Sequence, residues 1–346
     1  MPSSISSSEG TIAMAAAPPR RWALTWLLAL LTAAALVGYA EYHWRALGYR
    51  PNVRDSAQLW SMQRDRVYAA DPTPLVLLGA SRIEFAIDIN MLKELLPRYQ
   101  AVMLAQNAHY PLAALHDLAN DERFHGVVLC DLEAGGLERG YTDMQQPLVD
   151  YYHKQWAPSW NLHRRLLTHW QHRAVVADPD LGLTASALRL IDGAAAPRPD
   201  YFRFHPDRSG DIDYTQVDVQ AARKHFGEVL ANSDQLHADV APEQWRADLT
   251  QVYEWTKRIQ ARGGQVIFYQ SPTGPTLTRI EAIRHPKALY WDRFAADSPA
   301  PVLDAMDDPT LSAFELPDDS HLDYRSKPAY TRALVEALVR RGWLQK

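Results

Sequence analysis

Cysteine is almost absent from this sequence: Cys130 is the single one among 346 residues, which excludes an internal disulfide bond. It lies in the apolar run GVVLCDLE, so we expect a core residue rather than a reactive thiol. An excess of positive charge is also absent, because 36 Lys and Arg stand against 41 Asp and Glu. This balance argues against a nucleic-acid partner. The chain does have 47% hydrophobic residues, which is enough for a large core.

Charge is missing as well between Trp22 and Ala40, a stretch of 19 residues. As a helix this stretch would be about 28 Å long, close to the hydrocarbon thickness of a bilayer. Two arginines precede it, and aromatic residues mark both of its ends. We expect a disordered tail rich in Ser, Ala and Pro over 1–21, a transmembrane anchor over 22–40 and a linker over 41–70.

The alternative for this stretch is a cleaved signal peptide, with Gly38 and Ala40 as the small residues before the cut. The length and the flanking aromatic residues favour a retained anchor. We expect a single-pass protein of the cytoplasmic (inner) membrane, with its N-terminus inside and its main domain outside. The arginines next to the stretch lie on both sides of it: Arg20 and Arg21 before, and Arg45, Arg50 and Arg54 after.

Short apolar runs alternate with helical patterns in the rest of the chain. The runs are too continuous for half-exposed antiparallel strands and are typical of a buried parallel sheet. They cover residues 74–79, 101–106, 126–133, 264–271 and 300–306. We predict an α/β fold over 71–346, a doubly wound, flavodoxin-like and mostly parallel sheet of about five strands.

Between about 135 and 240 the alternation stops, and we expect a mostly helical, irregular insertion after the third strand. Leaving the carboxyl edge of the sheet, it would cover a ligand site there. The aromatic residues of 150–160 either stack on a sugar or pack the insertion onto the core. His163, His169 and His172 fit a basic helix face better than a metal site, and 205–214 fits a polar turn better than a calcium loop. We predict no metal and no organic cofactor.

Ser81 follows the first predicted strand and opens a helix in LLGASR, so it is either a helix cap or a nucleophile. A serine nucleophile needs a base, and His321 in LPDDSHLDYRSKPAYT follows Asp318 by three residues. That spacing lets the carboxylate hold one ring nitrogen and leaves the other for Ser81. Asp319 and Asp323 are alternative partners of His321. The segment precedes the last helix, at the sheet edge where Ser81 is expected.

The two motifs together resemble the SGNH (GDSL-type) hydrolase superfamily, in which the serine follows the first strand and an Asp-x-x-His precedes the last helix. The N-terminal span and the G-A-S-R turn are similar to membrane-anchored SGNH-like proteins of bacterial envelope glycan modification, such as the D-alanyl transfer protein of teichoic acids. The resemblance covers both ends of the α/β domain and not the insertion. It implies Ser81 as nucleophile, His321 as general base and Asp318 as the residue that orients it.

The chain departs from that family where oxyanion donors are expected. The second strand runs into Asn107 and Ala108 instead of a glycine-containing turn, and the third runs into CDLEAGG without G-x-N-D. Asn107 through its amide and Ala108 through its NH remain candidate donors, whereas Asp131 and Glu133 would repel an oxyanion. Arg82 is a candidate for compensating charge or binding a substrate carboxylate, or else forms a salt bridge with Glu84. The loop after the fourth strand could bring Ser271 or Thr273 to the substrate.

From these features we expect a membrane-anchored serine esterase or O-acyltransferase that acts on acyl esters, foremost acetyl esters, of an extracytoplasmic glycan. The alternative is an inactive SGNH-like protein that binds a glycan or a protein partner in an envelope polysaccharide modification or export complex. The intact Ser81, His321 and Asp318 favour the enzyme, and the altered oxyanion residues favour the binding protein.

Overall fold

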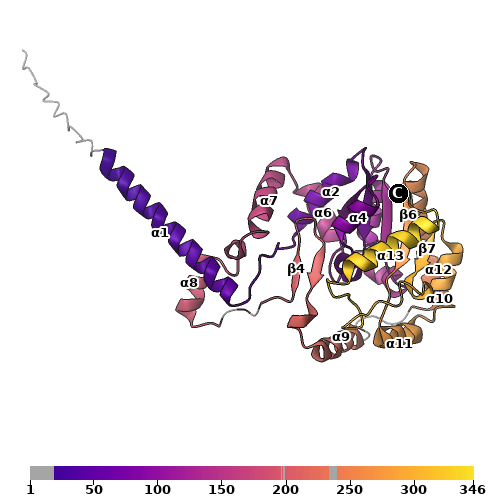
Figure 1. Ribbon diagram of the computed structural model, residues 1–346. Coiled ribbons are helices and arrows are strands. Elements are labelled where there is room, and N and C mark those ends of the chain that lie inside the picture. Colours follow the sequence, from indigo (N-terminus) through magenta and orange to yellow (C-terminus); the bar gives the residue numbers. More distant parts are fainter. Residues whose placement is uncertain (1–18, 196, 198, 234–239) are drawn as a thin grey trace, which may run out of the picture.

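The main sheet has five parallel strands in the order β2-β1-β3-β6-β7 (Figure 1). The computed structural model describes residues 19–346 apart from 196, 198 and 234–239. This strand order is that of flavodoxin-like sheets, so the predicted fold class is confirmed. The strands are β1 (Thr73–Leu78), β2 (Tyr99–Met103), β3 (Val127–Asp131), β6 (Gln265–Gln270) and β7 (Val302–Asp304).

Helices cover both faces of the sheet because alternate residues of each strand point to opposite sides. In β1, Val76 and Leu78 face one core and Leu75 and Leu77 face the other. The first core is completed by α2 (Ala57–Arg64), α5 (Leu112–Asn120), α10 (Pro242–Ala261) and α12 (Trp291–Asp297). The second is completed by α3 (Ser81–Ala86), α4 (Ile89–Leu95) and α13 (Lys327–Arg340). Cys130 is buried in the first core, as expected.

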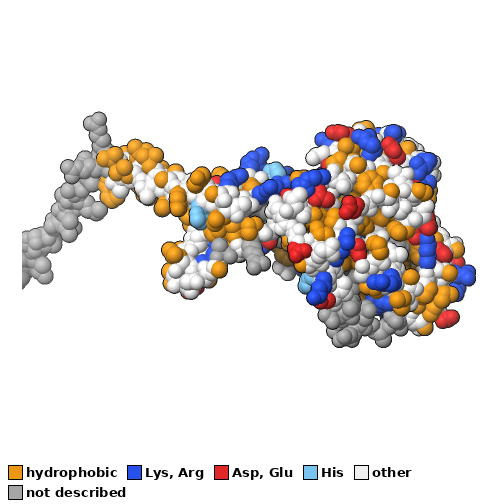
Figure 2. Space-filling model, turned by 60° about the horizontal axis from the view of Figure 1, so that its bottom comes forward, with side chains coloured by type: hydrophobic (Ala, Val, Ile, Leu, Met, Phe, Trp, Pro, Cys, Tyr) orange, Lys and Arg blue, Asp and Glu red, His pale blue; other side chains and the backbone are white. Residues whose placement is uncertain are grey.

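Helix α1 (Pro19–Ala46) extends away from the α/β domain (Figure 1). Its residues Trp22–Ala46 are long and apolar enough to cross a membrane, as a span or as a signal sequence. Figure 2 shows the apolar side chains along its exposed surface. The expected disordered tail lies for the most part outside the described residues, which begin at Pro19.

The segment 41–70, expected as a linker, instead supplies part of the core. Its helix α2 buries Leu59 and Trp60 completely, and Trp60 donates its indole NH to the Leu104 carbonyl at 3.0 Å. Two large apolar side chains in eight residues are sufficient to dock such a short helix, because a buried Trp or Leu side chain contributes roughly 1.5–3 kcal/mol.

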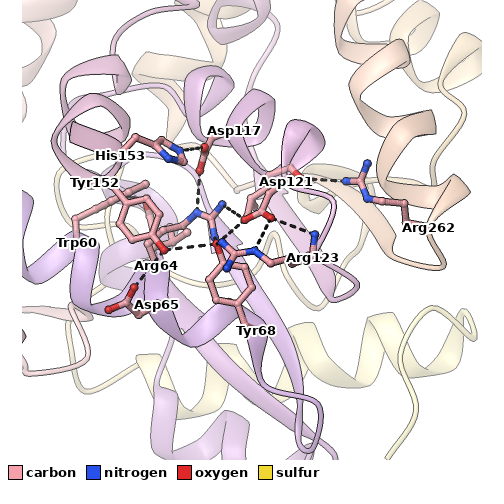
Figure 3. Close-up of polar contacts among 12 residues, drawn as sticks. Trp60, Arg64, Asp65, Tyr68, Asp117, Asp121, Arg123, Tyr152, His153 and Arg262 are labelled. Atoms are coloured by element: carbon pink, nitrogen blue, oxygen red, sulfur yellow. Dashed lines mark hydrogen bonds and ion pairs between the residues drawn. The ribbon is translucent and has the colours of Figure 1, made fainter. Parts of the chain in front are cut away.

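Arg64 at the end of α2 fixes this segment to α5 (Figure 3). Its guanidinium is fully buried and bonds Asp117 and Asp121 at 2.8 Å each. His153 adds a second contact to Asp117 at 2.5 Å. Burial opposes ionisation of Asp121, but hydrogen bonds from Tyr68 and Arg64 lower its pKa to about 2. The buried charge of Arg64 is therefore balanced by two carboxylates.

The chain between about 135 and 240 forms the expected insertion, and its described residues include four α-helices and one hairpin. The helices are α6 (Gln146–Lys154), α7 (Pro158–Gln171), α8 (Leu183–Asp192) and α9 (Val219–Ser233). The hairpin of β4 (Phe202–Phe204) and β5 (Gly210–Ile212) was not expected, because each of these short strands has a charged residue at its centre and so gives no apolar run. Within the segment 205–214, expected as a polar turn, residues 205–209 form the turn of the hairpin and Gly210–Ile212 form β5.

Most of the aromatic cluster expected at 150–160 packs internally rather than facing a ligand. Tyr152 lies edge-on against Trp60, and Trp156 donates to Asp65 at 2.8 Å. Trp160 is the exception, with 44% of its surface exposed. This arrangement favours the packing interpretation for the first part of the insertion.

Candidate active site

Ser81 lies at the carboxyl end of β1, where the strand passes through a two-residue turn into α3. The turn requires glycine at position 79, whose φ is +150°. A Cβ atom there would lie 2.6 Å from the side chain of Ile83 and 2.9 Å from the Asp131 carbonyl. The close approach of β1 to the end of β3 thus depends on Gly79 and sets Ser81 at the edge of the sheet.

His321 faces Ser81 across this edge. Its Nε2 lies 2.8 Å from the Ser81 hydroxyl oxygen, although the two residues are 240 positions apart. The ring stands edge-on to Phe85 of α3 and contacts Phe226 of α9, with ring centroids 6.0 and 5.9 Å away. Only 10% of the His321 side chain is exposed, so the two aromatic residues limit its movement.

Asp318 holds the other nitrogen of the histidine. Its Oδ2 lies 2.9 Å from Nδ1 of His321, while its Oδ1 accepts the backbone NH groups of Ser320 and His321 at 2.9 and 2.7 Å. Burial opposes ionisation, but the hydrogen bond and the charge of His321 lower the pKa of Asp318 to about 2, with a smaller contribution from Tyr214. A permanently ionised Asp318 keeps the proton of neutral His321 on Nδ1 and leaves Nε2 free to accept the Ser81 proton.

The two alternative partners of His321 have other roles. Asp319 has φ +70° and accepts the NH of Thr276 at 3.2 Å, while its carbonyl accepts the NH of Gly274 at 2.7 Å. A Cβ atom on Gly274 would lie 2.6 Å from the Asp319 Cα. Asp323 pairs with Arg325 at 2.9 Å. Asp319 therefore fastens the histidine loop to the loop after β6, which fixes His321 in place.

The turn after β2 lies against the serine turn. Gln106 donates its NH to the Gly79 carbonyl at 3.1 Å, and Asn107 and Ala108 form the two-residue turn that follows. Ala108 has φ +60°, the left-handed conformation that glycine adopts most easily. The alanine thus takes the backbone shape of the glycine expected at this point. Among hydrogen bonds between described residues, none is donated by the Ala108 NH or the Asn107 side-chain amide, so both remain candidate oxyanion donors.

Arg208, in the hairpin turn of the insertion, binds the C-terminal end of β2 and the residues that follow it. This residue was not identified from the sequence. Its buried guanidinium donates to the Met103 and Ala105 carbonyls at 3.1 and 2.7 Å and to Gln106 at 2.8 Å. It also pairs with Asp55 at 2.8 Å. An arginine in a polar turn gives no signal of this role, because its partners lie more than a hundred residues earlier.

Glu84, the expected partner of Arg82, faces Arg208 instead at 3.6 Å. It is completely buried, and burial raises its pKa well above the ordinary value although Arg208 acts in the opposite direction. A salt bridge between Arg82 and Glu84 is therefore wrong. The helical spacing of α3 directs residue 84 to the protein interior and residue 82 along the sheet edge.

Arg82 pairs with two carboxylates beyond the ends of β3 and β6. It forms a close ion pair with Glu133 and lies 3.5 Å from Glu281 of α11 (Pro275–Arg284). Burial opposes ionisation of Glu133, but Arg82 lowers its pKa to about 2. Burial and the charge of Glu133 raise the pKa of Glu281 well above its usual range. Protonation of Glu281 is therefore favoured, because Arg82 can balance only one of the two carboxylates.

The remaining carboxylate expected to repel an oxyanion, Asp131, is occupied by Ser271. Its two oxygens accept the NH and the hydroxyl of Ser271, each at 2.9 Å. Burial raises the pKa of Asp131 to about 6 against the opposing charge of Arg82. Neither Asp131 nor Glu133 is therefore a free carboxylate: Asp131 accepts both hydrogen bonds of Ser271, and Glu133 pairs with Arg82.

A cavity of about 210 Å³ begins at Arg82, the residue after Ser81, and follows the carboxyl ends of β3, β6 and β7. Polar and aromatic side chains line it together, among them Tyr110, Tyr141, Thr273, Glu281 and His285. Glu138 holds His285 through Nε2 at 2.7 Å. Such a mixture of acids and rings suits a polyhydroxylated ligand.

The three histidines of α7 and its C-terminal end do not converge. His169 contacts Arg173, and the ring of His172 lies against His205. Within the part of the chain that the structure describes, no group of three or more His, Cys, Asp or Glu side chains could hold a metal ion. Comparison with protein-family models and with curated protein sequences gives no match to this chain.

Proposed function

We propose that this protein is a membrane-anchored serine esterase or O-acyltransferase that acts on acyl esters of an extracytoplasmic glycan. The observation that carries the proposal is the unbroken hydrogen-bonded series from Ser81 through His321 to Asp318. A helix-capping serine needs no histidine at 2.8 Å, and a structural histidine needs no ionised aspartate behind it. Together they form the arrangement that activates a serine nucleophile.

In the first half of the reaction, Ser81 Oγ attacks the ester carbonyl carbon and His321 Nε2 accepts the hydroxyl proton. Asp318 stabilises the resulting imidazolium. The oxyanion of the tetrahedral intermediate accepts hydrogen bonds from the Ser81 NH at the start of α3, the Ala108 NH and the Asn107 amide. When the intermediate collapses, His321 returns the proton to the departing alcohol oxygen and the acyl group stays on Ser81.

In the second half, an oxygen nucleophile attacks the acyl-serine while His321 accepts its proton and then returns it to Ser81. Water as nucleophile gives an esterase, and a sugar hydroxyl gives a transferase. The cavity beside Arg82 is lined by carboxyl, amide and phenol groups, which bind hydroxyls; Arg82 is the residue that joins it to Ser81, which does not itself line it. This supports a glycan as acyl donor or acceptor.

Retention of α1 is supported by the way its C-terminal end joins the domain. A cut after Ala40 would fall inside a continuous helix, at a residue that is 9% exposed. The local charges are compatible with an N-terminus inside. Arg20 and Arg21 directly precede the apolar stretch, whereas Arg45, the first arginine after it, is balanced by Glu41 at 2.6 Å.

The proposal is tested by labelling the detergent-solubilised full-length protein with a fluorophosphonate, which reacts with activated serines. We expect the wild type to be labelled, and Ser81→Ala and His321→Ala to lose the label. Ser298→Ala serves as the matched serine control and keeps the label. It removes a hydroxyl that donates to the Ala300 carbonyl at 2.9 Å and accepts the Ala300 NH at 3.2 Å.

Labelled protein would then be incubated with O-acetylated oligosaccharides, and released acetate and acetylated acceptor would be measured. A folded wild-type protein that takes up no label would contradict the proposed enzymatic function. The binding function in an envelope complex would then be the better explanation of the fold.

A further inference from the structure

Helix α7 buries polar side chains and exposes apolar ones. The side chains on its buried face are Arg164, Thr168 and Gln171, all of them polar. Its opposite face carries an apolar stripe of residues four apart, exposed at 62%, 59% and 64%: Leu162, Leu166 and Trp170. A helix on the surface of a protein in water has the reverse arrangement, with its apolar stripe inward.

Helix α8, which follows α7 after the connecting residues 172–182, repeats this exposure. None of its residues is buried, and its large apolar side chains are exposed at 45% to 85%: Leu183, Leu188, Leu190 and Ile191. Most of the exposed large hydrophobic side chains outside α1 that the structure describes lie on these two helices. So concentrated an apolar surface marks an interaction site.

The segment that joins α7 to α8 is clamped to the last two turns of α1. Both carboxylate oxygens of Glu41 accept backbone NH groups, from Val175 at 3.1 Å and Val176 at 3.0 Å. Arg45 donates to the Arg173 carbonyl at 2.9 Å. Trp44 packs in a small core with Val175 and others, and the Arg189 guanidinium of α8 lies 5.6 Å from its ring centre.

This clamp sets the height of both helices relative to a membrane. The uncharged part of α1 ends at Ala40, and the clamp begins at the next residue. Residues 41–46 extend about 9 Å beyond the apolar stretch at 1.5 Å per residue, roughly the depth of the headgroup layer. In Figure 1, α7 and α8 flank the C-terminal end of α1, and α7 runs across its direction, as a helix lying on a bilayer would.

We propose that α7 and α8 lie in the interface of the bilayer that α1 crosses, with the apolar stripe of α7 and the apolar residues of α8 among the upper acyl chains. The charge of α7 fits the headgroups, since it carries arginines and histidines and no acidic residue. Figure 2 shows apolar side chains continuing from α1 onto the adjoining part of the chain, bordered by basic ones. The protein would thus hold its α/β domain, and Ser81, at a fixed height above the lipid.

The test places a fluorescent NBD label on the full-length protein in vesicles of phosphatidylethanolamine and phosphatidylglycerol. Cysteine is introduced as Leu190→Cys, as Leu166→Cys, and as Ile283→Cys in α11, whose side chain is 74% exposed away from this surface. Cys130 is fully buried, so the protein without an added cysteine measures the background. The mass of the purified protein verifies that α1 is present.

Doxyl groups on the lipid acyl chains should quench about half of the NBD emission at positions 190 and 166 and none of it at position 283. Iodide in the water should quench only the label at position 283. Quenching of all three positions by iodide would overturn the proposal, since the surface would then face water. Labels at 190 and 166 that neither quencher reaches would overturn it as well, because a second copy or another protein would cover them. These outcomes are independent of whether Ser81 is active.

Discussion

Replacing Asp318 by asparagine should inactivate Ser81 while the fold stays intact. In the wild type, Oδ1 accepts two backbone NH groups and Oδ2 faces His321 Nδ1. An asparagine keeps the two backbone bonds only if its oxygen takes the Oδ1 position. Its amide NH2 then points at Nδ1, so the imidazole must carry its proton on Nε2, facing Ser81. In that tautomer His321 cannot accept the hydroxyl proton.

The expected loss is about 10³- to 10⁴-fold in rate, as for the equivalent change in serine proteases. At about 1.4 kcal/mol for each factor of ten, this is roughly 4–5.5 kcal/mol of transition-state stabilisation. The assay is the second-order rate constant for fluorophosphonate labelling, with the melting temperature measured on the same samples.

Asp319→Asn is the matched control, since it is the neighbouring acid, is also buried, and has a left-handed backbone that asparagine tolerates. We expect it to stay within tenfold of the wild type. The reasoning would be refuted if Asp318→Asn labelled within tenfold of the wild type at an unchanged melting temperature. An equal loss of labelling rate in Asp319→Asn would also refute the reasoning. The loss would then come from disturbing the loop and not from removing the charge of Asp318.

Three further predictions concern stability. Ala108→Gly should raise the free energy of unfolding by up to about 1 kcal/mol, because φ is +60° there and glycine adopts this backbone conformation without strain. Labelling should be unchanged because the backbone NH remains. A lower melting temperature would count against this prediction. Arg64→Met should cost about 3–5 kcal/mol in urea unfolding, because two buried carboxylates lose their partner. Arg123→Met removes the exposed arginine of the same cluster and should have a much smaller effect in the same assay, because solvent screens its charge; equal losses would contradict the distinction. Asp318 should contribute about 2 kcal/mol of stability above about pH 4 that is lost as the pH falls towards its folded pKa of about 2. Asp318→Asn should therefore lose less stability than the wild type between pH 5 and pH 2.5, and equal acid losses would argue against the shifted pKa.

The main sheet could be predicted because each of its strands is buried on both faces and therefore reads as a continuous apolar run. The predicted run 264–271 corresponds to β6 at Gln265–Gln270, and 126–133 corresponds to β3 at Val127–Asp131. The core role of α2 could not be predicted in this way. Half of its sequence AQLWSMQR is polar, and its buried Arg64 has its partners on α5 and at the C-terminal cap of α5, more than fifty residues later.

The proximity of Ser81 and His321 could be predicted from the parallel sheet. Each residue lies beyond the carboxyl end of a strand, and parallel strands bring those ends to one edge. The surroundings of the pair could not. Phe226, Arg208 and Tyr214 reach the site from the insertion, where no pattern indicates which side chain points inward. Contacts of this kind depend on packing between elements and leave no local periodicity.

The acids near Ser81 show how packing can reverse an expectation drawn from residue type. Taken singly, Asp131 and Glu133 would oppose an oxyanion. In the folded chain Arg82 balances Glu133, and the charge of Glu133 together with burial favours the protonated form of Glu281. If Ser81 is the nucleophile that we propose, an asparagine is therefore not the only residue compatible with an oxyanion after the third strand. An acid is compatible too when a neighbouring arginine neutralises it, and G-A-S-R supplies that arginine at position 82.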